Sequence, residues 1–211
     1  MNGATMQAKL YKGMAKAAAK MGLTCSLYRP LIATAPFGNL VTSLPAQFRV
    51  DDKFSKPNTY GKPQWLAFVD GSQTAVGDIL QGPQGTFFIA AMQQLLPILV
   101  VETNHTITLA RCAIPGGFGA QTYNADTAGT ETAYATGWPA SILKGPKGEA
   151  NEVGLPGDVR QPWWDCLLPL IPGAPIATAD IITDEMGSRY IVSVAELSDL
   201  GWRLTLQQAV T

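Results

Sequence analysis

Apolar and polar residues follow a helical period at the start of the chain. The segment 2–22 is rich in Ala, Lys, Met and Leu, and Gly22 supplies a stop where such a helix should end. Its apolar positions are Met6, Leu10, Met14, Ala17 and Met21. The pattern predicts an amphipathic helix. Two roles stay open, because the helix either covers one end of its own domain or is an arm that docks on a neighbouring subunit.

Beyond residue 22 the pattern changes to short stretches that alternate with a period of two, which is typical of β-strands. The segment 23–76 is otherwise extended and irregular, because Pro and Gly turn signals interrupt it repeatedly. The expected strands are Gln47–Val50, Trp65–Val69, Asp78–Leu80, Thr86–Gln93, His105–Cys112 and the short piece Trp138–Leu143. The QGPQG turn joins two of them into a hairpin.

Two stretches of the chain share a pattern of residues. GDILQGPQGTFFIAAMQ begins at Gly77, and ADIITDEMGSRYIVSVAE begins at Ala179. The alignment places Asp78 on Asp180, Ile79 on Ile181, Gly85 on Gly187, Phe88 on Tyr190, Ile89 on Ile191, and TITL (106–109) on RLTL (203–206). The shared pattern is a strand, a hairpin and a return strand, which is most of a small barrel. Unrelated β-hairpins often share residue types, so the likeness is explained either by duplication of one unit or by chance.

These patterns predict a mainly β protein with two small related β-barrel or curled-sheet units, an N-terminal α-helix and long extended loops. The expected divisions are a helical arm over 1–23, a first β unit with an extended lead-in over 24–112, a Gly/Pro-rich loop insertion over 113–162 and a second β unit over 163–211. About fifty residues of loop are long for an idle connection, so the insertion is interpreted as an arm that orders on a partner or as a partly disordered segment.

Charge is distributed unevenly. Residues 1–62 carry nine Lys or Arg and two Asp, whereas the remainder carries six basic and fourteen acidic residues. Only 15% of the 211 residues are charged, which suits a protein that meets neighbours over much of its surface, and opposed charged ends suit head-to-tail packing. The lysines lack the interleaved aromatic residues of a base-stacking surface. We therefore do not expect nucleic acid to be the main partner.

No catalytic, metal-binding or cofactor-binding residue is assigned from the sequence. His105, the one histidine, begins an alternating strand without a partner motif for a hydrolytic triad. Asp78 and Asp180 recur ahead of a hairpin, where aspartate commonly bonds turn backbone. Cys25, Cys112 and Cys166 are odd in number and widely spaced, so they are interpreted as small hydrophobic residues. Regular lysines argue against a signal peptide, and no apolar run reaches membrane-spanning length.

The second copy resembles the small β-barrel head-completion and joining proteins of tailed bacteriophages. The matching residues are Asp180, Ile181, Gly187, Tyr190, Ile191, Val192 and GWRLTL (201–206). The GDIL, GTFFIAAMQ, LLPI and EVGLPGDVR segments also resemble proteins from the structural genes of such phages. The resemblance implies a non-enzymatic subunit of the virion tail or neck, made in the cytoplasm of the host bacterium, that forms a ring and bridges portal, adaptor, tail-tube, baseplate or fibre proteins. The chain is longer than the joining family, because it also has the basic helix and the Gly/Pro-rich middle.

The predicted protein contacts lie on the helix and on the loop 114–138. They are Lys9, Lys12, Lys16 and Lys20, with Phe118, Tyr123, Tyr134 and Trp138. Two rival functions remain. A virion-borne enzyme that degrades cell walls would need a carboxylate pair, for which Glu102, Asp126 and Glu131 are the candidates. A module that contacts DNA would use the basic first third.

Overall fold

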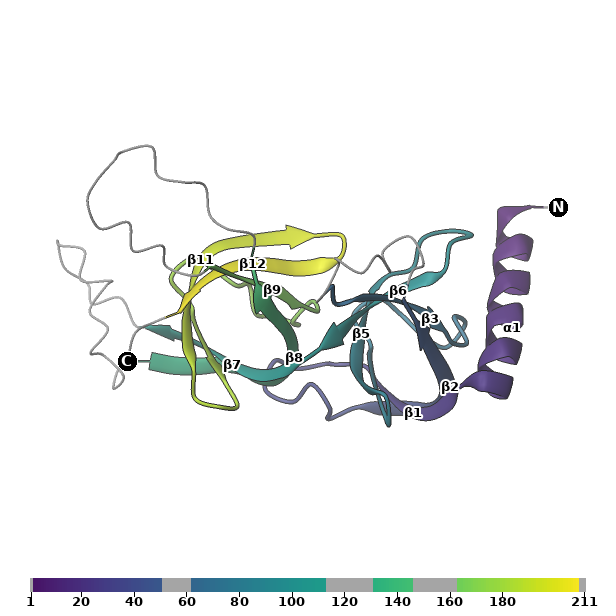
Figure 1. Cartoon of the computed structure of the whole chain (residues 1–211), viewed down its shortest axis with the longest axis horizontal. Coiled ribbons are helices and arrows are strands. Elements are labelled where there is room, and N and C mark those ends of the chain that lie inside the picture. Colours follow the sequence, from purple (N-terminus) through teal and green to yellow (C-terminus); the bar gives the residue numbers. More distant parts are fainter. Residues whose placement is uncertain (1, 51–61, 113–130, 146–162, 209–211) are drawn as a thin grey trace.

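The computed structural model describes residues 2–50, 62–112, 131–145 and 163–208. As predicted, the protein is mainly β, with one helix ahead of two small barrels (Figure 1). The elements are α1 (Gly3–Met21), β1 (Leu23–Tyr28), β2 (Leu40–Arg49), β3 (Gln64–Phe68), β4 (Ile79–Gly82), β5 (Gly85–Ala91), β6 (Ile98–Thr103), β7 (His105–Cys112), β8 (Glu131–Lys144), β9 (Trp163–Leu168), β10 (Ile181–Asp184), β11 (Arg189–Ser198) and β12 (Gly201–Gln208). In the described part of the chain, no helix is long and apolar enough to cross a membrane.

Helix α1 has the predicted limits but packs through a different stripe. The side chain of Asn2 caps its first turn by accepting from the Thr5 N–H at 3.0 Å, and the Gly22 N–H closes its last turn on the Ala18 carbonyl. Met14 and Ala18 are buried against the first barrel, whereas Met6 and Met21 of the predicted stripe are exposed. The error arises because the inward face also uses Tyr11, which the apolar periodicity did not single out.

The first barrel is a closed sheet with the strand order β1-β2-β3-β6-β5-β4, and the pairing of β1 with β4 closes it. Side chains that alternate inward along each strand fill its interior, as expected for a small barrel. Its core contains Cys25, Leu27, Leu44, Ala46, Phe48, Ala67, Val69, Leu80, Phe87, Ile89, Ile98 and Val100. The Phe48 and Phe87 rings stack with their centroids 3.8 Å apart.

The second barrel repeats this topology, because its order is β7-β8-β9-β12-β11-β10 and the pairing of β7 with β10 closes it. Most of the registers match as well. Equivalent pairs of strand partners are Cys25–Leu44 with Ile107–Trp138, Leu27–Leu80 with Leu109–Ile182, and Phe48–Ala67 with Ile142–Cys166. The register differs between β7 and β8, where an additional shift between Ile107 and Leu109 pairs Leu109 with Ala135. Equal strand order and largely equal register in two closed barrels favour duplication over chance likeness between hairpins.

The strand pairing of the two hairpins shows that the sequence alignment is wrong by one residue after the turn. Ile79 pairs with Phe88 in the first barrel, and Ile181 pairs with Ile191 in the second. Phe88 therefore matches Ile191, and Tyr190 matches Phe87. The cause is turn length, because the turn after β4 is the dipeptide Pro83-Gln84, whereas the second turn has three residues and ends with Gly187 at φ 83°.

The strand pairing moves the division between the two units. Strand β7 pairs with β8 and β10 of the second barrel, so the first barrel ends at Thr103 and the predicted boundary at residue 112 is wrong. The match of TITL with RLTL is wrong for the same reason, since β12 corresponds to β6. The predicted loop insertion contains the long strand β8, while 113–130 and 146–162 lie outside the described residues.

The two barrels form one packed body. Asn104 alone separates β6 from β7, and its side chain bonds both backbone groups of Ile142 at 2.8 and 2.9 Å. The connection between β1 and β2 reaches across to β8, where the Ala33 carbonyl accepts bonds from the Thr136 N–H and the Trp138 indole. A third apolar cluster fills the space between the barrels. It contains Ile79, Phe88, Ala90 and Val101 of the first barrel with Leu167 and Leu200 of the second.

Candidate functional site

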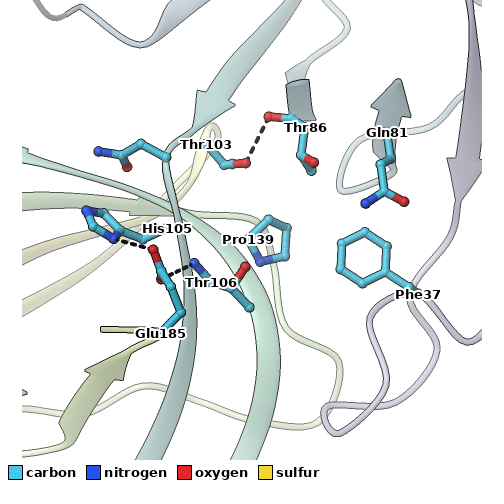
Figure 2. Close-up of a pocket in the computed structure, with 9 residues that line it drawn as sticks. Phe37, Gln81, Thr86, Thr103, His105, Thr106, Pro139 and Glu185 are labelled. Atoms are coloured by element: carbon cyan, nitrogen blue, oxygen red, sulfur yellow. Dashed lines mark hydrogen bonds and ion pairs between the residues drawn. The ribbon is translucent and has the colours of Figure 1, made fainter. Parts of the chain in front are cut away.

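A polar cleft of about 260 Å³ lies where the two barrels meet. Figure 2 shows its lining, which comes from the β1–β2 connection, the β4–β5 hairpin, the β6–β7 junction, β8 and the β10–β11 turn. The lining residues are Phe37, Gln81, Thr86, Thr103, Asn104, His105, Thr106, Pro139 and Glu185. We call this the junction cleft. Both barrels contribute to it, so its shape depends on how they are joined.

Glu185 and His105 form the charged centre of the junction cleft. His105 Nδ1 lies 3.1 Å from Glu185 Oε1, and the Thr106 N–H donates to Oε2 at 2.8 Å (Figure 2). Burial alone would raise the pKa of Glu185, but the Thr106 and Glu185 backbone N–H groups and the His105 imidazole together hold this pKa below its ordinary value. Glu185 is thus anchored as a carboxylate that ties the β10–β11 turn to the start of β7.

The neighbouring polar groups of the cleft are also engaged in holding the structure. The Thr103 hydroxyl donates to the Thr86 carbonyl at 2.8 Å, which joins β6 to β5. Asp184, which is buried, accepts the N–H groups of Met186 and Ser188 at 3.0 and 2.7 Å and so closes the β10–β11 turn. The His105–Glu185 pair is therefore part of a polar joint between the two barrels.

A second polar feature occurs in both barrels. It is an aspartate–arginine pair beside the two strands whose pairing closes the barrel. In the first barrel, Arg29 follows β1 and binds both carboxylate oxygens of buried Asp78, at 2.8 and 2.7 Å. Asp78 Oδ2 also accepts the Ala75 N–H at 2.7 Å, and the guanidinium donates to the Gln73 carbonyl. The hydrogen bond to Asp78 raises the pKa of Arg29. This fork-shaped pairing fixes the approach to β4.

The second barrel repeats this arrangement atom for atom. Arg111 binds both oxygens of Asp180 at 2.7 and 2.8 Å, Asp180 Oδ2 accepts the Ala177 N–H at 2.7 Å, and Arg111 donates to the Pro175 carbonyl. We call the pairs Arg29–Asp78 and Arg111–Asp180 the first and second latch. The prediction that both aspartates bond turn backbone is confirmed. The arginines were missed, although each lies close to the end of a strand in the similar strings LYR and LAR.

The second latch has one additional member. The Tyr134 hydroxyl donates to Asp180 Oδ2 at 2.8 Å, and the Arg111 guanidinium carbon lies 5.1 Å from the centre of the Tyr134 ring. Burial and the bond to Asp180 raise the pKa of Tyr134 above its ordinary value, so the hydroxyl stays a donor at neutral pH. In the first latch, Arg29 binds both carboxylate oxygens of Asp78. The second latch has the same bidentate pair, and Tyr134 adds a cation–π contact with Arg111 and a third donor to Asp180.

The predicted contact residues have different fates. Lys9, Lys12, Lys16 and Lys20 lie exposed along one face of α1, as predicted, and their role in binding stays a prediction. Tyr134 is engaged in the second latch. Trp138 is fully buried in the second core, so it is a core residue and offers no surface to a partner. Phe118 and Tyr123 lie outside the described residues.

The carboxylates suggested for an enzyme are not brought together. Glu102 belongs to the first barrel, where it accepts from the Trp65 indole at 2.9 Å, and Glu131 belongs to the second barrel, where it pairs with Arg189. Asp126 lies outside the described residues. Within the described ranges, no group of three or more His, Cys, Asp or Glu is placed to hold a metal ion. Cys25 and Cys166 are buried free thiols, and Cys112 is a half-buried one.

Comparisons of the chain with protein-family models, with curated proteins and with solved structures give no match. The fold alone defines the class of this protein. The protein is a tandem of two six-stranded barrels with equal topology, each closed by an aspartate–arginine latch and joined through a polar cleft.

Proposed function

We propose that this protein is a structural subunit of a tailed-bacteriophage particle, acting as an adaptor in the tail or the head-to-tail joint. In the particle it forms a symmetric ring and bridges other virion proteins. One observation carries the proposal. The residues that resemble head-completion and joining proteins fall on β10, β11 and β12, the residue just before β10 and the β10–β11 turn, and these three are adjacent strands of one closed six-stranded barrel. A small closed barrel is the fold that the resemblance implies.

The disposition of the polar groups supports a structural role. The two latches bond strand ends to turn backbone, and the Glu185–His105 pair holds a hairpin turn against β7. The buried acids, Asp78, Asp180 and Asp184, all accept backbone N–H groups. These carboxylates and the histidine thereby stabilise the scaffold, and the exposed lysines of α1 offer a charged surface.

The phage whose genome encodes this chain provides the test. Quantitative mass spectrometry of purified particles should find the protein in a fixed number of copies per particle. A phage with the gene disrupted should accumulate heads and tails that remain separate in electron micrographs, and supply of the gene in trans should restore joined particles. Absence of the protein from purified particles, together with normal particles after disruption, would overturn the proposal.

A further inference from the structure

Helix α1 packs on the first barrel through one side only. Met14 and Ala18 are buried, and Tyr11 packs on the interior core of this barrel. At 3.6 residues per turn, these three side chains leave the helix within an arc of about 60°. Figure 1 shows α1 at one end of the molecule, beside the first barrel and away from the second. The other side of α1 therefore faces solvent.

The outward side of α1 carries a row of lysines, Lys9, Lys12, Lys16 and Lys20, which we call the lysine stripe. All four are exposed. Their spacing of three and four residues places them within an arc of about 80°, on the side of the helix away from Ala18, and spreads them over about 17 Å of its axis. Small residues flank the stripe, namely Ala8, Gly13, Ala15 and Ala19. A partner can therefore approach the ammonium groups closely.

Most of the charge of the lysine stripe has no compensating carboxylate. Residues 2–22 contain no Asp or Glu. Among the residues that the structure describes, Lys12, Lys16 and Lys20 form no ion pair. Asp70, which precedes the glycine against which Tyr11 lies, is engaged with Ser72 and Gln73 instead. The stripe thus stays strongly positive on a chain whose net charge is −1.

The residues of the outward side distinguish between classes of partner. Protein interfaces are depleted of lysine at their centre and are anchored by aromatic, Met or Arg side chains, but the exposed Met6 and Met21 lie at the two ends of α1. A helix that binds membranes buries its apolar side in lipid, but the apolar side of α1 is buried on the barrel. Single-stranded nucleic acids stack on aromatic side chains, and the one aromatic residue of α1, Tyr11, packs inward.

Duplex DNA requires only positive charge at a suitable spacing. It carries one phosphate charge per about 1.7 Å of its axis, and lysine binds phosphate as a point charge. A row about 17 Å long is therefore within reach of several phosphates of one duplex. The diameter of an α-helix, about 10–12 Å, also matches the major groove of B-form DNA, which is about 12 Å wide, whereas the major groove of duplex RNA is narrow.

We propose that the lysine stripe binds the phosphate backbone of double-stranded DNA, with no preference for its sequence. The lack of stacking aromatic residues weighs against single strands but not against duplex phosphates. The first barrel holds α1 so that the four charges stay in one row. This binding goes beyond the structural role proposed above and concerns the purified chain, so it can fail while the protein is still found in virions.

The test measures how DNA binding depends on salt. Fluorescence anisotropy of a labelled duplex of about 20 base pairs should show binding at about 50 mM salt, with a slope of about −3 to −4 for the logarithm of the association constant against that of the salt concentration. In Lys12→Gln/Lys16→Gln the slope should shrink to about −2, and the affinity at about 50 mM salt should fall at least tenfold. Gln favours a helix as Lys does, so circular dichroism should stay unchanged. Lys12→Arg/Lys16→Arg should keep both the slope and the affinity.

A matched variant controls for net charge. Lys144→Gln/Arg203→Gln removes two exposed charges from the second barrel and should bind DNA as wild type does. No binding at about 20 mM salt would overturn the proposal, and so would an unchanged slope in Lys12→Gln/Lys16→Gln or an equal loss in the matched variant. Tighter binding to a single strand of the same length would overturn it as well. So would sedimentation with vesicles of phosphatidylglycerol and phosphatidylcholine in place of duplex binding, because the partner would then be a membrane.

Discussion

The two barrels solve the same closure problem with different residues. Ahead of Asp78, the first barrel places Gly77 at φ 89°, whereas ahead of Asp180 the second places Ala179 at φ 70°. Glycine adopts this left-handed conformation at little cost, and alanine pays a steric penalty of about 1 kcal/mol. The second barrel also has Tyr134 on its latch. Equal backbone geometry is thus maintained by a favourable residue in one barrel and by an additional contact in the other.

The outer faces of the two barrels also differ, and here the residues of the first barrel are the more deeply buried. Phe88 and Ala90 of the first barrel are buried by the second barrel, while the matching Ile191 and Ser193 are half-buried. The cores share their strand order but differ in content, because Leu44 in the first barrel corresponds to Trp138 in the second. The two barrels therefore share their strand order and the latch, whereas their packing and surface residues differ.

The largest expected difference between the barrels lies at Leu44 and Trp138. Trp138→Ala should lower the free energy of unfolding by about 4–5 kcal/mol, because it empties the second core and removes the indole donor to the Ala33 carbonyl. Leu44→Ala should cost about 3 kcal/mol, since a smaller side chain is lost. Urea denaturation followed by tryptophan fluorescence and circular dichroism measures both. An equal or smaller cost at Trp138 would contradict its role in joining the barrels.

The next difference concerns the latches. Asp180→Asn should cost about 3 kcal/mol and Asp78→Asn about 2 kcal/mol, because each change weakens a charge-assisted pair on a buried group and the second latch has one more donor. The values allow for the partial exposure of both arginines. Urea denaturation gives both costs. In a Tyr134→Phe background the cost of Asp180→Asn should fall to that of Asp78→Asn, and an unchanged gap would show that Tyr134 is not its source.

Local patterns predicted the helix and the hairpins, because caps, glycine turns and alternation act over a few residues. Strand β2 was largely missed, and β8 was reduced to a short piece, since a proline inside a strand argues against one. Yet Pro45 and Pro139 occupy equivalent positions, in the strings LPAQF and WPASI. These strings, with LYR and LAR, are the signals that could have located the strands and latches.

The features that no local pattern could supply are long-range pairings. Arg29 and Asp78 are separated by 49 positions, and Arg111 and Asp180 by 69, so only the closed barrel brings them together. Periodicity marks His105–Cys112 as a strand but does not say which barrel it joins. The junction cleft was invisible for the same reason, because its His105 and Glu185 are 80 positions apart.

A reciprocal exchange at the left-handed position should have a smaller effect. Gly77→Ala should destabilise the protein by about 1 kcal/mol, since a Cβ there meets no neighbour and the cost is conformational alone. Ala179→Gly should stabilise it by up to about 1 kcal/mol, an amount reduced by the greater freedom of glycine in the unfolded chain. Thermal and urea unfolding of both variants measure the two changes. Two changes of the same sign would contradict the equivalence of the positions.

The smallest expected effect is the loss, in acid, of the stability that Glu185 contributes to the second barrel. Glu185 has a pKa below its ordinary value in the folded protein, so its contribution to stability is present above the unfolded pKa of about 4.3 and is lost as pH falls through the folded pKa. Because the side chain is 43% exposed, Glu185→Gln should cost less than about 1 kcal/mol at pH 7. The stabilities of wild type and variant should converge below about pH 4. Urea unfolding at several pH values measures this.

The first barrel supplies the control for that measurement. Its β4–β5 turn is Pro83-Gln84, so the matching hairpin has no carboxylate at its tip. Gln84→Ala should therefore change stability by an amount that does not depend on pH between about 3 and 7, whereas the effect of Glu185→Gln should vanish in acid. An effect of Glu185→Gln that stays constant over this range would show that the Thr106 and His105 bonds do not favour the charged carboxylate. The β10–β11 turn would then owe its position to the Asp184 bonds alone.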